Sequence, residues 1–132
     1  MPLVRYIGLL YFLVFVAVFS IDFLFWEQCT QWFPTSKSLA SFQFSFYLVH
    51  GIATVTGLLF AVPSFIRRFG FTNIFYSLPL TLLSGCVILL LFIFTDMPAR
   101  TLFFGFVGFQ FLRYLVFENA FSPIYQIFFA AI

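Results

Sequence analysis

Four long apolar segments, separated by short polar stretches, dominate the pattern of residues along this chain. They cover approximately residues 6–25, 42–66, 74–94 and 101–125. Each is long enough to supply the roughly 20 residues with which a helix crosses the hydrocarbon core of a bilayer. The first is too long and too uniform for a signal peptide. The pattern predicts an all-α integral membrane protein with four transmembrane helices in a single domain, residues 1–132.

The polar stretches predict how these spans are joined. Residues 26–38 (WEQCTQWFPTSKS) form the first expected connection, with Trp26 and Trp32 as anchors at the membrane interface. Near the end of the chain, Ser122 and Pro123 allow a kink in one long helix or the start of a separate interfacial helix. We favour the single kinked helix.

Basic residues predict the turn after the second span and the orientation of the chain. Gly70 is expected to cap that helix, with Arg67 and Arg68 at the negative end of its dipole and beside the lipid head groups. The two sides of the membrane would hold Arg5, Arg67 and Arg68 against Lys37 and Arg100. By the positive-inside rule, the N-terminus and the Arg67–Arg68 turn are cytoplasmic, in a cell (inner) membrane.

Composition agrees with the membrane prediction and narrows the function. The chain is 64% hydrophobic and only 8% charged, whereas soluble domains carry roughly 25% charged residues. A net charge of +2 gives no reason to expect a nucleic acid polymer as partner. Two cysteines and one histidine predict neither a disulfide framework nor a metal site. No clustered acids or nucleophile–base motif indicates an enzyme, and no cofactor is expected.

One face of the second span carries polar or small residues. Polar residues inside a membrane span are the positions that most often have a function. Its members follow alternating spacings of four and three residues, so they share one side of a helix: Gln43, Tyr47, His50, Thr54, Gly57, Ala61 and Ser64. Either close helix packing or the lining of a water-accessible cavity explains this stripe. His50 fits an interhelical hydrogen bond or a proton relay.

The fourth span separates into two sectors. A smooth strip suited to helix contact contains Gly105, Gly108 and Leu112, with Asn119 on the same side. The opposite arc contains Gln110, Arg113, Tyr114 and Glu118. Arg113 and Glu118 lie about 140° apart on the helix, so a salt bridge within it is not expected. Gln110 with Arg113, and Tyr114 with Glu118, are better spaced.

Charges inside an apolar span need a physical reason, because each costs about 2.5–3.5 kcal/mol on insertion scales. Arg113 can snorkel to the interface, form a buried pair with another helix, or line a polar transport pathway. Asp22 reaches the head groups if its helix ends there, or faces the bundle if the helix continues. In the third span, Ser77, Thr81, Ser84 and Gly85 are expected to serve packing only.

Three stretches in this order resemble one transporter family: SIDFLFWEQCTQWFP, PSFIRRFG and FLRYLVFENAFSPIYQIFF. Together they are similar to the second half of the bacterial and plastid ATP/ADP exchange transporters, which have the major facilitator fold. The resemblance implies helices seven to ten of a larger transporter. The acid of the family pattern matches Asp22, whereas Trp26 and Glu27 follow where a lysine is expected. That departure leaves the nucleotide specificity open.

The functional expectation is therefore a segment of a secondary transporter that moves an anionic solute, with nucleotide exchange as one candidate. Its substrate path would be lined by Arg113, Glu118, Gln110, Tyr114, His50, Gln43, Tyr47, Thr54 and Asp22. The expected partners are the lipid bilayer, the small anion, and either the remaining transporter helices or further copies of the chain. The alternative is a small four-helix membrane subunit or scaffold without transport activity.

Overall fold

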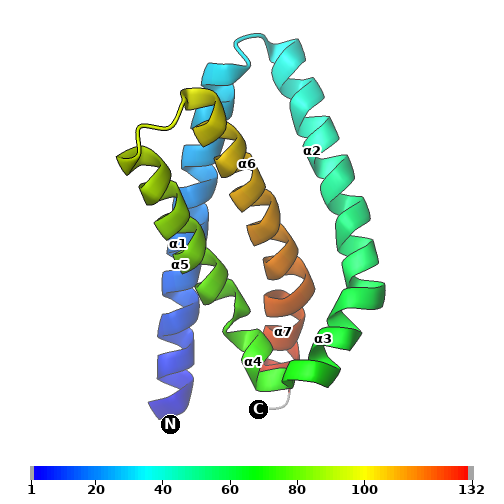
Figure 1. Cartoon of the computed structure of the whole chain (residues 1–132). Coiled ribbons are helices and arrows are strands. Elements are labelled where there is room, and N and C mark those ends of the chain that lie inside the picture. Colours follow the sequence, from blue (N-terminus) through cyan, green and yellow to red (C-terminus); the bar gives the residue numbers. More distant parts are fainter. Residues whose placement is uncertain (1, 131–132) are drawn as a thin grey trace. The chain divides into compact units, whose positions relative to one another are not determined.

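The computed structural model describes residues 2–130, and within this range it contains helices and no strands (Figure 1). Four helical stretches are long and apolar enough to cross a membrane: Val4–Trp32, Ser36–Phe69, Thr72–Phe94 and Ala99–Ala120. The prediction of an all-α chain with four candidate spans is thus confirmed at the level of helix number, length and composition. The chain divides into two compact units, one ending at Leu39 and one starting at Ala40, and we describe each by itself.

The first unit contains helix α1 (Pro2–Trp32) and the turn that follows it. The expected connection over residues 26–38 is wrong in extent, because only residues 33–35 are non-helical. Nothing before Pro34 prevents the polar residues from continuing the helix, and the Phe33 N–H still donates to the Cys29 carbonyl at 2.9 Å. Thr35 then caps the next helix, because its hydroxyl accepts the N–H of Ser38 at 3.2 Å.

The second unit begins within helix α2 (Ser36–Thr56), which runs on through a π-helical segment, η1 (Gly57–Ala61), into α3 (Val62–Phe69). Gly70 ends this run with a φ of 76°, and its N–H donates to the Ile66 carbonyl at 3.0 Å. A left-handed residue at a helix C-terminus favours glycine because it has no Cβ. The predicted cap at Gly70 is confirmed.

The third span contains a short helix, α4 (Phe71–Phe75), and a long one, α5 (Ser77–Phe94), which ends in a tight turn. Asp96 follows with a φ of 49°, and the Met97 N–H donates to the Phe92 carbonyl at 3.2 Å. This bond spans five residues and closes the helix end as in a Schellman motif, with aspartate in place of glycine.

The final helical run contains α6 (Ala99–Val116), a second π-helical segment η2 (Phe117–Phe121), and α7 (Ser122–Ala130). Ser122 and Pro123 lie inside this run, which has no break between α6 and α7. The structure therefore has the single helix that we favoured over a separate interfacial one.

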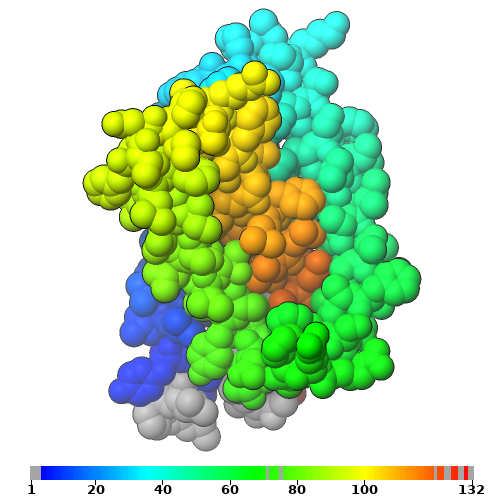
Figure 2. All heavy atoms as spheres, viewed as in Figure 1, coloured from blue at the N-terminus to red at the C-terminus, as the bar shows by residue number. Residues whose placement is uncertain are grey.

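Helices α5 and α6 lie side by side and run antiparallel (Figure 1). A Cβ built on Gly85 would overlap the ring of Phe109, and one built on Gly105 would lie 2.8 Å from the ring of Phe92. Each glycine thus leaves room for a phenylalanine of the other helix. In Figure 2, which draws the atoms as spheres, the yellow-green atoms of α5 adjoin the yellow and orange atoms of α6.

The predicted smooth strip on the fourth span is only partly right. Gly105 makes the expected close contact, but nothing lies within 4 Å of a Cβ built on Gly108. Leu112 is 52% exposed. Close approach requires a ring from the facing helix as well as a small residue. The spacing of residues along one helix does not predict where such a ring lies on the other.

Helix α2 contacts α6 through large side chains. The ring centroids of Phe42 and Phe103 are 6.3 Å apart, and those of Phe46 and Phe111 are 5.9 Å apart. Contacts advance in the same direction along both helices, so α2 and α6 run parallel. Outward-facing apolar residues, such as Leu59 and Leu80, are about two-thirds exposed, as expected for surfaces that face lipid.

Candidate functional site

Three polar side chains from two candidate spans meet within the second unit. His50 and Thr54 come from α2, and Glu118 comes from η2. The Glu118 carboxylate Oε2 lies 3.8 Å from His50 Nε2 and 3.4 Å from Thr54 Oγ1, and Thr54 Oγ1 is also 3.4 Å from His50 Nε2. These distances are long for hydrogen bonds. They are short enough for strong electrostatic interaction in an apolar environment. We call these three residues the His–Glu cluster.

Aromatic rings cover the histidine end of this cluster. The His50 ring meets the rings of Tyr114 at 5.4 Å and Phe111 at 5.8 Å, both in edge-to-face arrangements. The side chain of His50 is 7% exposed, whereas that of Glu118 is 46% exposed. The cluster is therefore closed at the imidazole and open at the carboxylate.

Arg113 lies five residues before Glu118 and is fully buried. Its Nε donates to Gln110 Oε1 at 3.1 Å, and its Cζ lies 4.3 Å from the ring centroid of Tyr114. Full burial excludes snorkelling to a polar surface of the chain, and the predicted pairing with Gln110 is confirmed. The Tyr114 ring contacts both His50 and Arg113, so it links the guanidinium to the His–Glu cluster.

The remaining residues predicted for the substrate path lie outside these short contacts. Tyr47 is 48% exposed, and its ring reaches Tyr114 at 6.5 Å. Gln43 is half-buried about two turns before His50 on α2. Asp22 belongs to the other unit, where α1 continues past it to Trp32, so it does not end its helix.

The predicted cytoplasmic turn is exposed and structurally simple. Arg67 and Arg68 occupy the last turn of α3, before Gly70. The Arg67 Nε lies 3.5 Å from the Pro63 carbonyl, and the Arg68 guanidinium lies 5.9 Å from the ring of Phe69. These basic groups stabilise the C-terminal end of the helix dipole, as predicted from the sequence.

Several hydroxyl side chains of the second and third spans donate hydrogen bonds to backbone carbonyls of the same helical run. Ser64 donates to the Phe60 carbonyl at 2.9 Å. In α5, the hydroxyl of Ser77 donates to Ile74, that of Thr81 to Ser77 and that of Ser84 to Thr81. All these acceptors are backbone carbonyls of the preceding turn. Such bonds leave the helix surface free for packing.

The two π-helical segments were not predicted, and each precedes a proline by the same interval. Pro63 and Pro123 stand two residues after the ends of η1 and η2. A proline ring clashes with the carbonyl four residues earlier, and a wider turn relieves that clash. The bonds across five residues run from Val62 N–H to Gly57 O and from Ser122 N–H to Phe117 O. Such segments are frequent at functional sites.

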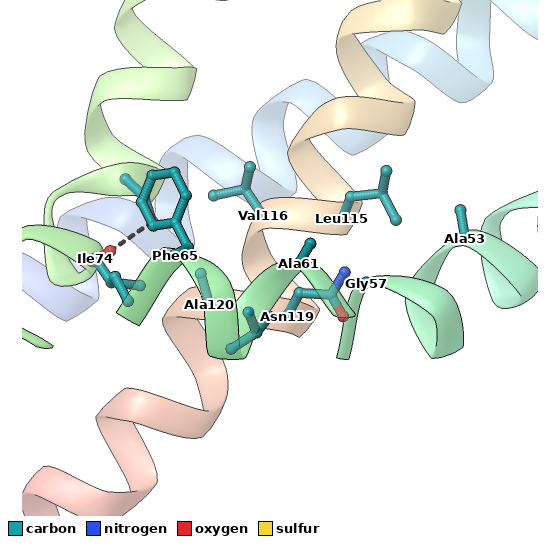
Figure 3. A pocket seen from close by; sticks show the side chains of 11 residues that line it. Ala53, Gly57, Ala61, Phe65, Ile74, Leu115, Val116, Asn119 and Ala120 are labelled. Atoms are coloured by element: carbon teal, nitrogen blue, oxygen red, sulfur yellow. Dashed lines mark hydrogen bonds between the residues drawn. The ribbon is translucent and has the colours of Figure 1, made fainter. Parts of the chain in front are cut away.

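The π-helical segments meet where Gly57 faces Asn119 (Figure 3). A Cβ built on Gly57 would lie 2.5 Å from Asn119 Nδ2, so only glycine fits without movement of the amide. Asn119 Oδ1 is buried, and among the described residues it has no hydrogen-bond partner. The amide lines a mainly apolar cavity of about 280 Å³ with Ala53, Gly57, Ala61, Val62, Phe65, Ile74, Ser77, Leu115, Val116 and Ala120.

Comparison of the chain with protein-family models, curated protein sequences and solved structures found no match. The chemistry of the site must therefore be inferred from its geometry. A buried guanidinium can bind an anion, and the His–Glu cluster can bind a proton. Both groups contact the same tyrosine, so a change at one can affect the other.

Proposed function

We propose that this chain is a membrane-spanning segment of a secondary transporter for a small anionic solute. The observation that carries the proposal is the full burial of the Arg113 guanidinium in an apolar candidate span. A buried cation inside a membrane is costly and is characteristic of substrate and ion pathways. A nucleotide is one candidate solute, because the sequence resembles the ATP/ADP exchange transporters.

Arg113 is suited to this role by its chemistry and its surroundings. A guanidinium presents a planar fork of N–H donors that matches a carboxylate or a phosphate. Tyr114 stacks on the fork, and Gln110 accepts its Nε–H, so the side chain is held in place before an anion arrives. His50 and Thr54 supply polar groups on the facing helix α2.

Alternating access requires helices that change their relative tilt around such a site. The segments η1 and η2 provide places for this change in the two helices that carry the polar residues. Helix bending is concentrated at prolines and π-helical turns. In this proposal, α2–α3 and α6–α7 bend at these segments while α5 stays packed on α6.

Uptake of labelled anions tests the proposal. Cells that express the chain are supplied with labelled ADP, ATP, inorganic phosphate or a dicarboxylate, and Arg113→Gln is compared with Arg100→Gln. Arg100 is the matched control because it is exposed at the start of the same helix. Loss of a buried hydrogen bond to a charged group corresponds to about a tenfold to hundredfold decrease in uptake for Arg113→Gln alone. Equal uptake by the two variants at equal abundance would remove Arg113 from the mechanism.

A four-helix subunit or scaffold is the second candidate function. The close fit of Gly85 with Phe109 and of Gly105 with Phe92 favours it, because α5 and α6 have a dedicated packing interface. The hydroxyls of α5 also bond to their own helix. This candidate predicts that the purified chain forms a defined oligomer and that cells expressing it take up none of the four anions above background.

A further inference from the structure

We infer that His50, Thr54 and Glu118 form a proton-binding site, and that H⁺ is the ion coupled to movement of the anion. The first part rests on the geometry of the cluster. The second part rests in addition on the proposed transport function. The inference names both a binding site and the coupling ion of that transport.

The positions of the three polar atoms provide a route for a proton. Thr54 Oγ1 lies 3.4 Å from the Glu118 carboxylate and 3.4 Å from His50 Nε2. A hydroxyl donates one hydrogen bond and accepts others. A proton that leaves protonated Glu118 for the Thr54 oxygen is matched by release of the hydroxyl proton to His50 Nε2. Thr54 is unchanged, the carboxylate becomes charged and the imidazole becomes an imidazolium.

The two ends of this route differ in access. The Glu118 side chain is 46% exposed and the His50 side chain is 7% exposed. Phe111 and Tyr114 pack edge-on against the imidazole. Protons therefore enter and leave at the exposed Glu118, and the positive charge is held at the buried His50.

The ionisable groups around the cluster set how many protons it holds. Helix α2 adds Tyr47, and α6 adds Tyr114 and the buried cation Arg113. Of the other elements packed against η2, α4 has no titratable residue and α5 has only the exposed Cys86. In α7 the titratable residue is Tyr125, whose side chain lies outside the described part of the structure. The basic residues of α3, Arg67 and Arg68, are exposed. One proton leaves the His–Glu pair neutral overall, whereas a second adds a positive charge beside Arg113.

This charge balance predicts the direction of coupling. An anion bound at Arg113 neutralises the guanidinium, which shares the Tyr114 ring with His50. Positive charge on the cluster is then less unfavourable, because like-charge repulsion is reduced. Anion and proton therefore bind cooperatively, and by linkage each increases the affinity for the other. Cooperative binding of this kind corresponds to movement of both in the same direction.

The single histidine of the chain makes the proton site directly measurable. The full chain, labelled with ¹⁵N at histidine and placed in lipid nanodiscs, is titrated by NMR between about pH 4 and pH 9. Replacing the nearby carboxylate by an amide in Glu118→Gln removes stabilisation of the imidazolium. The pH dependence of the His50 ¹⁵N signals should then differ between Glu118→Gln and the unaltered chain. Asp96→Asn is the matched control, because Asp96 lies in the exposed loop after α5, and it should leave this pH dependence as it is in the unaltered chain.

The same pH dependence of the His50 signals in Glu118→Gln as in the unaltered chain, with the backbone NMR spectrum preserved, would overturn the proton site. The coupling is tested in vesicles that contain a pH-sensitive dye and receive a gradient of ADP or inorganic phosphate. Anion uptake with simultaneous acidification supports coupling. Anion uptake without proton movement overturns the coupling and leaves the proposed transport intact. Absence of anion uptake refutes transport by this chain without further helices and with it the coupling, while the His50 NMR signals still decide the proton site.

Discussion

Replacement of Gly85 by alanine tests the packing of α5 against α6. The added methyl group would overlap the Cδ2, Cε2 and Cζ atoms of Phe109. That ring is 8% exposed and stacks near Phe106 with centroids 6.5 Å apart, so it has little room to move. The ring or the helices must shift, and overpacking of this kind costs about 1–3 kcal/mol.

Gly108→Ala is the matched control, because nothing lies within 4 Å of its built Cβ. Alanine in a helix interior is favoured over glycine by about 0.5–1 kcal/mol, so this variant should gain stability. The same preference partly offsets the loss at Gly85. Gly85→Ala should therefore unfold more easily than Gly108→Ala by about 1–3 kcal/mol.

The free energy of unfolding is measured for the purified chain in mixed micelles, with increasing SDS and far-UV circular dichroism as the readout. A second substitution, Phe109→Leu, removes the ring and should restore part of the stability of Gly85→Ala. A double-mutant cycle isolates this interaction, because the two residues are in contact. Equal stability of Gly85→Ala and Gly108→Ala would refute the close approach of α5 and α6 at this point.

Two further predictions concern the contact between the π-helical segments. Gly57→Ala should be less stable in the same SDS titration than Gly51→Ala, because a Cβ built on Gly51 meets nothing within 4 Å. The loss of stability should be smaller than for Gly85→Ala, because the Asn119 amide can rotate. Equal stability of Gly57→Ala and Gly51→Ala would contradict the contact between Gly57 and Asn119. Asn119→Leu should be neutral or should stabilise the chain by about 1 kcal/mol, because it removes a buried oxygen that has no partner among the described residues. A loss above about 2 kcal/mol would show that this oxygen is hydrogen-bonded in the membrane.

Local sequence signals predicted helix number and some helix ends. Gly70 follows a basic last turn, and its positive φ is one that glycine adopts without strain. The pairing of Gln110 with Arg113 follows from their separation of three residues on one helix. The prediction of a connection directly after Phe25 is wrong, because polarity is a weaker helix-stop signal than proline, and α1 continues to Trp32, two residues before Pro34.

Features that depend on a second helix could not be predicted. The partner of Glu118 is His50 on another span. The positions of residues on the fourth helix alone do not predict this pairing. A π-helical turn holds more residues than an α-helical turn, so the regular spacing of polar residues on the second span did not predict the one at η1. Prolines inside apolar segments, at Pro63 and Pro123, were the signal that could have located both π-helical segments.

Cysteine accessibility at Thr54 tests the central claim that the His–Glu cluster faces a polar path in the membrane. In a chain whose native residues are replaced by Cys29→Ser and Cys86→Ser, Thr54→Cys is compared with Val55→Cys, a position that is 58% exposed on the outer surface of α2. Both variants are treated in membranes with a charged, water-soluble thiosulfonate. The account predicts modification of Thr54→Cys and protection of Val55→Cys by lipid. Protection of Thr54→Cys, with both variants modified after solubilisation in SDS, would show that the cluster only packs helices together.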